Sequence, residues 1–384
     1  MSQHHDVWVI TRANNRDLIE STRLDWVQRV HWIYYDLPGW LRFWKKGGRG
    51  VQLYYYLWQI GAYFTVRRLL RTTPLDLVHH VTFGKFWVPS WMGLLPIPLI
   101  FGPVGGGEDT PAQLLQGLTP RQQRFEALRN LARGLFRYDP VLRRTLRKAT
   151  VVAATKETAT VIEQYFHPRH AIIIPQVGVS VTEMAKFDAI APKTCGPFRL
   201  LSIGRLVHWK GYHLAIKAFA QFLKTYPNAE YWLVSSGPER EALETLAQSL
   251  GCGKQVKFLG RLPTLDAVYA KLEQADALVH PALHEAFGNA CLEAMAAGRP
   301  VICLNEGGPG LQVTPETGIA VEPGTEEETV DRLAQAMTRL ATTPGLAANM
   351  GRMARQRVRE QFSWEEMARQ MNVVYKENAY SVQH

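Results

Sequence analysis

The stretch FRLLSIGRLVHWKG, residues 198–211, decides the fold, because it reads as a buried strand followed by a glycine-containing turn. The same order of short apolar strand, turn and helix-forming segment repeats along the rest of the C-terminal half. Further elements are expected at 211–225 (helix), YWLVSSG 231–237, 239–250 (helix), VKFLG 256–260, 264–273 (helix), ALVHP 277–281, 289–297 (helix) and PVICL 300–304. Such alternation predicts a doubly wound domain with a parallel sheet, whose loops gather at the carboxyl ends of the strands.

The N-terminal half shows a second alternation of the same kind. Strands and helices are expected there at Val7–Ile10, 51–71 (helix), Leu75–Val78, Leu99–Phe101, 121–148 (helix), Thr150–Ala154 and Ala171–Ile174. Between the two halves, Pro175–Pro197 carries several helix breakers and is predicted to be an irregular connection. Near the end of the chain, Ser363-Trp-Glu-Glu366 has the form of a helix-capping sequence and predicts a last helix from about Ser363 to Tyr380.

The sequence therefore predicts two Rossmann-like α/β domains. The expected boundaries are 1–175 for the first domain, 176–196 for the linker, 197–362 for the second domain and 363–384 for the terminal helix. A length of 384 residues suits two domains of common size. Residues 1–175 hold 23 Lys and Arg against 12 Asp and Glu, whereas residues 176–384 hold 21 against 22. Halves of such different charge are expected to have different partners.

The four cysteines indicate a reducing compartment rather than a metal site. They show neither CxxC spacing nor histidines at metal-ligand intervals. We therefore expect buried thiols at Cys195, Cys252, Cys291 and Cys303.

Two cations lie in the turn after the strand FRLLSI. Gly204 gives this turn exposed backbone N–H groups, and Arg205 and Lys210 follow it. An arginine binds phosphate with two parallel hydrogen bonds and a lysine acts as a point charge. Two cations on one diphosphate can replace the metal that many sugar-transfer sites use. Taken alone, however, an arginine and a lysine near a turn are more often ordinary surface residues.

Two carboxylates follow the strand ALVHP, in His284-Glu-Ala-Phe-Gly-Asn-Ala-Cys-Leu-Glu293. Asn289 is expected to cap the next helix, and Glu285 and Glu293 would lie roughly 12 Å apart if the spacing were helical throughout. That distance suits the sugar and ribose ends of a nucleotide-sugar. The N–H groups of Phe287, Gly288 and Asn289 would then face the phosphates between them. Without the basic turn nearby, a helix cap and a solvated helix face would be the better interpretation.

These segments resemble the retaining glycosyltransferases of family 4. The resemblance rests on SIGRLVHWKG and HEAFGNACLEAMAAGRPVI, with VKFLG (256–260) and LNEGG (304–308) matching that family's base-side and sugar-side loops. It implies the GT-B fold, in which two Rossmann-like domains face each other across a cleft and the terminal helix crosses back to the first domain. It also implies a hexosyltransferase that needs no metal or other cofactor and makes a cell-envelope or exopolysaccharide product.

The resemblance also implies the roles of individual residues. Arg205 and Lys210 would bind the donor diphosphate, Glu285 the donor sugar and Glu293 the ribose. The remaining donor-side positions implied are Gly204, Gly260, Arg261, Phe287, Gly288, Asn289, Gly307 and Gly308. Front-face departure of the nucleoside diphosphate would leave Glu285 a positioning role rather than that of a nucleophile.

The chain departs from the family pattern at two places. Its first segment matches the family's second strand, so the first strand and its glycine-rich loop are expected to be missing and to leave a gap in the N-terminal sheet. In addition, the histidine that many members carry after the strand at 99–101 is replaced here by GPVGGGED. Candidates for the acceptor side are then His79, His80, Gly105, Gly106 and, more weakly, Glu108 with Asp109. For both histidines, packing at a strand end is the simpler interpretation.

Residues 26–50 interleave aromatic residues with cations, as a membrane-surface patch does. A basic aromatic rim around an acceptor groove is the alternative, and no RNA-binding motif accompanies the segment. The start of the chain lacks the apolar core of a signal peptide. Residues 86–107 are too rich in proline to span a membrane and are better interpreted as a short buried helix followed by a strand. We therefore expect a cytoplasmic enzyme, peripheral on an anionic membrane.

Two other functions remain open from the sequence. A nucleotide-sugar epimerase has the same architecture and would turn over the donor without an acceptor. An inactive nucleotide-sugar-binding protein or membrane scaffold would bind the donor weakly and transfer nothing.

Overall fold

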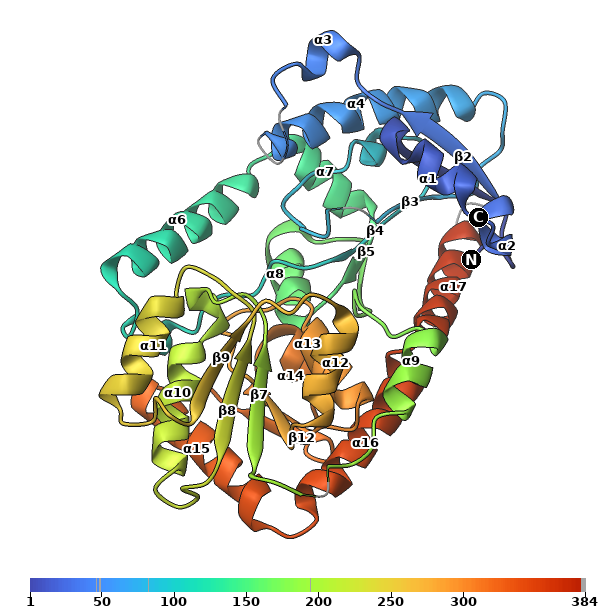
Figure 1. Cartoon of the computed structure of the whole chain (residues 1–384). Coiled ribbons are helices and arrows are strands. Elements are labelled where there is room, and N and C mark those ends of the chain that lie inside the picture. Colours follow the sequence, from blue (N-terminus) through green and yellow to red (C-terminus); the bar gives the residue numbers. More distant parts are fainter. Residues whose placement is uncertain (46, 48–49, 82, 194, 381–384) are drawn as a thin grey trace.

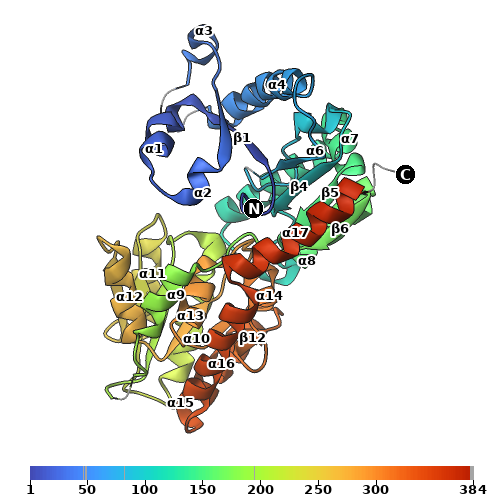
Figure 2. The same cartoon turned by 90° about the vertical axis from the view of Figure 1, so that its right-hand side faces the viewer.

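The computed structural model describes residues 1–45, 47, 50–81, 83–193 and 195–380. It has two α/β halves, the N-terminal half lying above the C-terminal half in Figure 1. The terminal helix α17 (Trp364–Tyr380) runs from the lower half to the upper half, as Figure 2 shows.

The C-terminal half is built on one six-stranded parallel sheet with the strand order β12-β11-β10-β7-β8-β9. Its strands are β7 (Arg199–Ile203), β8 (Glu230–Val234), β9 (Val256–Gly260), β10 (Ala277–His280), β11 (Val301–Leu304) and β12 (Gly318–Val321). Its helices are α9 (Val181–Asp188), α10 (Tyr212–Phe222), α11 (Arg240–Ser249), α12 (Leu265–Glu273), α13 (Asn289–Ala296), α14 (Gly307–Gln312), α15 (Glu326–Thr342) and α16 (Leu346–Gln361), with the short 3-10 helix η3 (His208–Lys210). The doubly wound domain predicted from the sequence is confirmed.

Helices cover both faces of this sheet. On one face α10, α11 and α15 pack through residues such as Phe219, Leu243 and Met337. On the other face α9, α12, α13 and α16 pack through residues such as Phe187 and Met295. These apolar side chains are almost completely removed from water, which is the main stabilising term of such a three-layer domain.

The strands of the N-terminal half form two separate parallel sheets. One contains β1 (Val7–Arg12) and β2 (Val30–Tyr35), and the other has the order β3-β4-β5-β6. The strands of the second sheet are β3 (Val78–His80), β4 (Leu99–Val104), β5 (Thr150–Ala153) and β6 (His170–Ile173). In the described part of the chain, no strand joins the two sheets.

The larger N-terminal sheet is also covered on both faces. The helices of this half are α1 (Arg16–Ser21), α2 (Asp25–Gln28), α3 (Gly39–Arg42), α4 (Val51–Leu69), α5 (Ala112–Leu115), α6 (Pro120–Phe136), α7 (Pro140–Lys148) and α8 (Lys156–Phe166), with the 3-10 helices η1 (Ala13–Asn15) and η2 (Trp91–Leu94). Helices α4, α7 and α8 pack on one face. The opposite face packs against α17, where Met367, Met371 and Val374 contact Ile100 and Val152.

The two chain crossings between the halves lie side by side. Val179 donates a backbone hydrogen bond to the carbonyl of Phe362 at 2.8 Å, and Trp364 donates one back to Val179 at 3.2 Å. Ser363 caps α17 by accepting from the N–H of Glu366 at 3.2 Å, so the predicted terminal helix and its cap are confirmed.

Several expectations for the backbone need correction. The predicted irregular connection contains α9, whose Met184 and Phe187 belong to the core of the C-terminal half. The helix expected at 121–148 is two helices, because Pro140 cannot continue α6 and instead starts α7 with Asp139 as its cap. The strand expected at Leu75–Val78 begins only at Val78. Beyond these, β2, α14, β12, α15 and α16 were not among the expected elements.

The surface predictions can be compared with the structure only in part. Within residues 26–50, Trp40 and Phe43 are strongly exposed while β2 runs through the middle; residues 46, 48 and 49 lie outside the described residues. Residues 86–107 hold η2 and β4, as expected, and none of the described helices is both long and apolar enough to cross a bilayer. Three of the four thiols are buried, but Cys195 is exposed because it lies in the loop before β7 and not in the sheet.

Candidate functional site

The functional loops meet where the strand order of the C-terminal sheet reverses. Strands β7 and β10 are neighbours although they are far apart in sequence, and ligands of doubly wound folds bind at such a switch point. The loop after β7 carries residues 204–211 and the loop after β10 carries residues 281–288. The N–H of Leu283 donates to the carbonyl of Trp209 at 2.8 Å, which holds the two loops together.

Gly211 is required for this close approach. Its φ is +65°, and a Cβ at this position would lie 1.9 Å from the carbonyl oxygen of Pro281. Gly204, at the start of the turn, also has a positive φ of +150°, and a Cβ there would lie 2.7 Å from the hydroxyl of Tyr212. The turn can therefore bring its cations to the switch point only with glycine at both ends.

The two predicted phosphate ligands differ in exposure and in ion pairing. Arg205 is exposed, and its guanidinium forms neither an ion pair nor a hydrogen bond with any residue that the structure describes. Lys210, at the end of η3, forms an ion pair with Glu285, and both side chains are more than four-fifths buried. Burial lowers the pKa of Lys210 below its usual range, although the carboxylate beside it favours the charged form. The free site thus keeps one unpaired cation next to a neutralised pair.

His280 lies directly beneath this pair. Its Nε2 atom is 3.6 Å from Glu285 Oε2, longer than a hydrogen bond, and the imidazole is buried in β10. Burial, and then the charge of Lys210, lower the pKa of His280 well below its usual range, so it is neutral near pH 7. The sequence prediction did not include His280, since a histidine inside an apolar strand reads as core.

The loop 285–288 is supported by the glycines that begin α14. The N–H of Gly308 donates to the carbonyl of Glu285 at 2.8 Å, and that of Gly307 donates to Glu157 Oε1 at 3.2 Å. A Cβ on Gly307 would lie 2.2 Å from the Glu285 carbonyl oxygen. Both predicted donor-side glycines are therefore at the site, but their N–H groups are already engaged and act on the loop, not directly on a ligand.

The start of α13 differs from the prediction. Its cap is Gly288, at φ +63° and without a side chain, while Asn289 is the first helical residue and is exposed. The N–H groups of Phe287, Gly288 and Asn289 donate to no described residue, which leaves them available to an anion. Because α13 begins only at Asn289, the spacing of Glu285 and Glu293 is not helical throughout.

Glu293 lies on the second turn of α13 and is largely buried. Burial, followed by the negative charge of Glu183 on α9, raises the pKa of Glu293 to about 7. It has no hydrogen-bond donor among the described side chains, so its carboxylate keeps its full accepting capacity for hydroxyl groups. Gly260 and Arg261 lie at the same edge of the sheet, at the end of β9, where Gly260 has φ +70° and accepts from the N–H of Ser235 at 2.8 Å.

The glycine-rich loop after β4 brings the N-terminal half against this site. A Cβ on Gly105 would lie 2.7 Å from Cβ of Ala286, and a Cβ on Gly106 would lie 2.2 Å from the Trp87 ring. Glu108, however, is a buried anchor: it accepts from Thr155 at 2.5 Å, Thr158 at 2.8 Å and the N–H of Gly106 at 2.8 Å. Its oxygens hold the loop to the start of α8.

Both candidate acceptor-side histidines have engaged rings. His79 Nε2 donates to the carbonyl of Gly102 at 2.7 Å, so Nδ1 accepts from the hydroxyl of Tyr375 on α17 at 2.6 Å. Burial lowers the pKa of His79 to about 4. His80 contacts the Tyr55 hydroxyl and the Ser90 hydroxyl, each at 2.5 Å. The simpler interpretation, packed strand-end residues, therefore describes both.

A cluster that was not predicted links the two halves at this site. Glu126, on α6, is buried; its Oε1 accepts from His208 Nε2 at 2.9 Å and lies 3.4 Å from His284 Nε2. Its Oε2 accepts from Arg129 at 2.8 Å. Trp209 stacks between Phe125 and His284, with ring centroids 5.6 and 6.1 Å away. The only signal in the sequence was an isolated acid in a basic helix.

The described residues contain no group of three or more His, Cys, Asp or Glu side chains that could hold a metal ion. The charged and hydrogen-bonding groups described at the site are Arg205, Lys210, the free N–H groups before α13 and the two glutamates.

The comparisons with known proteins agree with this geometry. Residues 185–357 match the family model described as glycosyl transferases group 1. Glycogen synthase from Mycobacterium tuberculosis is 35% identical over 190 residues, which are 49% of this chain and 44% of that protein. A GDP-mannose-dependent monoacylated alpha-(1-6)-phosphatidylinositol monomannoside mannosyltransferase from Corynebacterium glutamicum is 36% identical over 181 residues, 45% of this chain and 46% of that protein. The matched region thus spans less than half the length of each of these relatives.

A solved structure matches nearly the whole chain. Sucrose-phosphate synthase from Thermosynechococcus elongatus superposes with a TM-score of 0.66 at 21% identity, covering 98% of this chain and 90% of that one. The expected GT-B fold is therefore confirmed. The match to the group 1 glycosyltransferase model lies within the C-terminal half.

Proposed function

We propose that this chain is a retaining, metal-independent hexosyltransferase of family 4, which moves a hexose from a nucleoside diphosphate sugar to a glycan or lipid-linked acceptor. The observation that carries the proposal is the composition of the switch point. An unpartnered arginine, a buried lysine–glutamate pair and three unbonded N–H groups all lie on the two loops that meet there.

The diphosphate would bind between Arg205 and the start of α13. Arg205 supplies a bidentate donor without first breaking an internal ion pair, so its binding costs little reorganisation. Lys210 can share its charge between Glu285 and the β-phosphate. As the bond to the sugar breaks, negative charge grows on the leaving diphosphate, and these fixed cations stabilise it.

The two glutamates would orient the ends of the donor. Glu285, held by Lys210 and by the Gly308 N–H to its carbonyl, would accept hydrogen bonds from sugar hydroxyls. Glu293 would accept from ribose hydroxyls in its carboxylate form. Retention is then proposed to proceed by front-face departure, with a phosphate oxygen of the donor taking the acceptor proton. Precise orientation and not a protein nucleophile would supply the rate enhancement.

The acceptor would approach from the N-terminal half, across the glycine loop at 105–107. The mannosyltransferase relative is named for a phosphatidylinositol-linked substrate, which supports an acceptor attached to a lipid, and hence a role in envelope or exopolysaccharide synthesis. We further propose that the protein is peripheral on the cytoplasmic face of an anionic membrane, with the exposed Trp40 and Phe43 of segment 26–50 among its contacts.

Calorimetric titration with UDP, GDP and ADP tests the donor site, since the base is not specified by these residues. Saturable binding of one nucleotide that is lost in Arg205→Ala and Glu293→Ala supports the proposal. The sugar nucleotides of the base that binds would then be tested with extracted lipid-linked acceptors. Donor conversion without any acceptor would indicate an epimerase instead, and no binding by folded protein would overturn the donor site.

A further inference from the structure

Helix α6 lies on the protein with its polar face inward. Leu128, Leu131 and Leu135, spaced three and four residues apart on one side, are 66%, 60% and 60% exposed. On the opposite side, Glu126 is buried against the C-terminal half. This is the reverse of an ordinary surface helix, which buries its apolar stripe. In Figure 1 the helix runs along one flank of the molecule.

The inverted orientation is fixed by strong contacts. Arg133 donates to the carbonyls of Gly106 at 2.9 Å and Glu108 at 3.0 Å and pairs with Asp109, while Arg129 pairs with Glu126 at 2.8 Å. Rotating α6 to bury its leucines would break these charge-assisted bonds and leave His208 without Glu126 as its acceptor. The apolar side of α6 is thus held in solvent by the rest of the protein.

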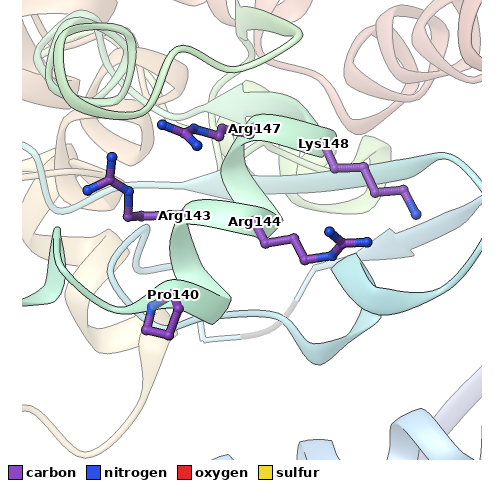
Figure 3. Close-up of a pocket in the computed structure, with 5 residues that line it drawn as sticks. All are labelled: Pro140, Arg143, Arg144, Arg147 and Lys148. Atoms are coloured by element: carbon purple, nitrogen blue, oxygen red, sulfur yellow. The ribbon is translucent and has the colours of Figure 1, made fainter.

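The next helix along the chain carries a cluster of positive charge. Arg143, Arg144, Arg147 and Lys148 of α7 line a hollow of about 520 Å³ (Figure 3), and none of the four forms an ion pair in the described structure. Residues 119–148 contain nine Arg and Lys and two acids. Of these acids, Glu126 is buried and Asp139 caps α7 by accepting from Leu142 at 2.9 Å. Neither acid forms an ion pair with the four cations of α7 in the described structure.

We propose that the outward leucines of α6 and the cations of α7 dock the protein on an anionic lipid surface. Exposed apolar side chains of a helix together with arginines are what inserts at the level of lipid headgroups. Each arginine or lysine near such a surface gains attraction from anionic lipid, and the four cations of α7 have no carboxylate partner in the described structure. A second copy of this chain is a poor occupant, because a symmetric contact would set arginine against arginine.

This surface is separate from the donor residues and from segment 26–50, so its test does not depend on transferase activity. The experiment is flotation of the protein with phosphatidylcholine vesicles, with and without phosphatidylglycerol. We expect flotation only with phosphatidylglycerol. Arg143→Glu/Arg147→Glu should weaken partitioning by about 25-fold or more, and Leu128→Ser/Leu131→Ser/Leu135→Ser by on the order of 100-fold.

Matched substitutions outside the surface control for charge and apolar area. Arg339→Glu/Arg352→Glu and Leu18→Ser/Leu265→Ser change exposed residues of the same kinds and should float like the wild type. Melting temperature and nucleotide affinity of every variant check that the fold and donor site are intact. Three results would each overturn the proposal. The first is equal flotation of all variants, and the second is loss of flotation only in Trp40→Ser/Phe43→Ser. The third is a dimer in sedimentation that becomes a monomer when the leucines are substituted.

Discussion

The carboxylate of Glu126 accepts a hydrogen bond from His208 at 2.9 Å, and this bond joins helix α6 of the N-terminal half to the turn that carries Arg205 and Lys210. The same carboxylate is within 3.4 Å of His284, the residue before Glu285. One buried acid therefore contacts both loops of the candidate site from the opposite half of the molecule. Glu126 acts on the site by positioning these loops.

Removing this charge should destabilise the closed arrangement of the two halves. Burial alone would raise the pKa of Glu126, but hydrogen bonds from His284 and His208 and the charge of Arg129 lower it to about 2. Glu126→Gln leaves Arg129 only the more distant Asp109 as counter-ion and removes the charge that His208 and His284 face, so we expect a loss of about 3 kcal/mol in unfolding free energy. Chemical denaturation measures it, with Asp266→Asn, which breaks an exposed ion pair to Lys186, as the near-neutral control.

The pH dependence of that loss has a defined sign. A glutamate whose folded pKa is depressed contributes stability that is present above its ordinary pKa of 4.5 and is lost as pH falls toward about 2. The difference between wild type and Glu126→Gln should therefore shrink between these values. A difference that stays constant over this range would mean that the charge of Glu126 is not what stabilises the contact.

Arg205→Ala should affect nucleotide binding and leave stability unchanged. The guanidinium forms no hydrogen bond or ion pair with a described residue, so its removal breaks no such interaction in the free protein. A charge-assisted bond to phosphate contributes about 1.5–3 kcal/mol. Its loss should therefore weaken nucleotide binding roughly 10- to 150-fold. Calorimetry alongside Arg352→Ala, an exposed arginine of α16, checks this. Comparable weakening in both variants would indicate a general charge effect and not a phosphate ligand.

Lys210 and Glu285 should behave as a coupled pair. Either single alanine substitution leaves a largely buried charge unpaired, whereas the double substitution removes both charges. We expect each single substitution to lower the free energy of unfolding by more than half of the loss caused by the double substitution. The coupling energy should be about 1–3 kcal/mol. A double-mutant cycle in urea measures the coupling. Additive effects would show that the ion pair contributes nothing to the unliganded site.

Donor affinity should rise with pH through the range set by Glu293. Its pKa of about 7 means that the carboxylate proposed to accept from ribose is mostly protonated below that pH. Binding to the carboxylate form would then be about tenfold weaker at pH 6 than at pH 8. Glu293→Gln should remove this component and leave only the titration of the nucleotide itself. Glu183→Gln, which removes the neighbouring charge, should move the transition to lower pH; an unshifted transition would assign it to another group.

Gly211→Ala should prevent the turn from forming. The new methyl group would lie 1.9 Å from the Pro281 carbonyl oxygen at a φ of +65°, so both the backbone and the neighbouring loop must move. We expect the free energy of unfolding to fall by more than about 3 kcal/mol. Nucleotide binding should be lost as well. Gly134→Ala on α6 is the matched control: it has open space around it and should stabilise the helix by up to about 1 kcal/mol. Melting temperatures of the two variants separate the effects.

Much of the C-terminal half could be predicted from the sequence, because its strands are short apolar runs and its motifs sit at strand ends. The strands at 199–203 and 277–280 and the loops after them lie where they were expected. The cap of α13 was assigned to Asn289 because asparagine is a common cap, but the sharp turn after Phe287 needs the positive φ of Gly288. Helix α9 was missed because the breakers around it, such as Gly178 and Pro192, masked eight helical residues.

The contacts between the halves could not be predicted in this way. Glu126 and His208 are 82 positions apart, and nothing local in either segment indicates the other. His79 and Tyr375 likewise meet only because α17 returns to the first half. The inverted orientation of α6 could not be predicted from the sequence for the same reason. Its apolar spacing is that of any amphipathic helix, and only the partners of Arg129 and Arg133 decide which side faces the protein.

The return of α17 also determines the order in which the two halves can mature on the ribosome. The sheet β3-β4-β5-β6 is complete once residue 173 has been made, but the helix that covers one of its faces is encoded at 364–380. Until then Ile100 and Val152 have no cover from Met371 and Val374. The C-terminal half, whose layers are all encoded between 181 and 361, can therefore close first. Of the two larger sheets, the one that is synthesised first is thus the one whose second face is covered last.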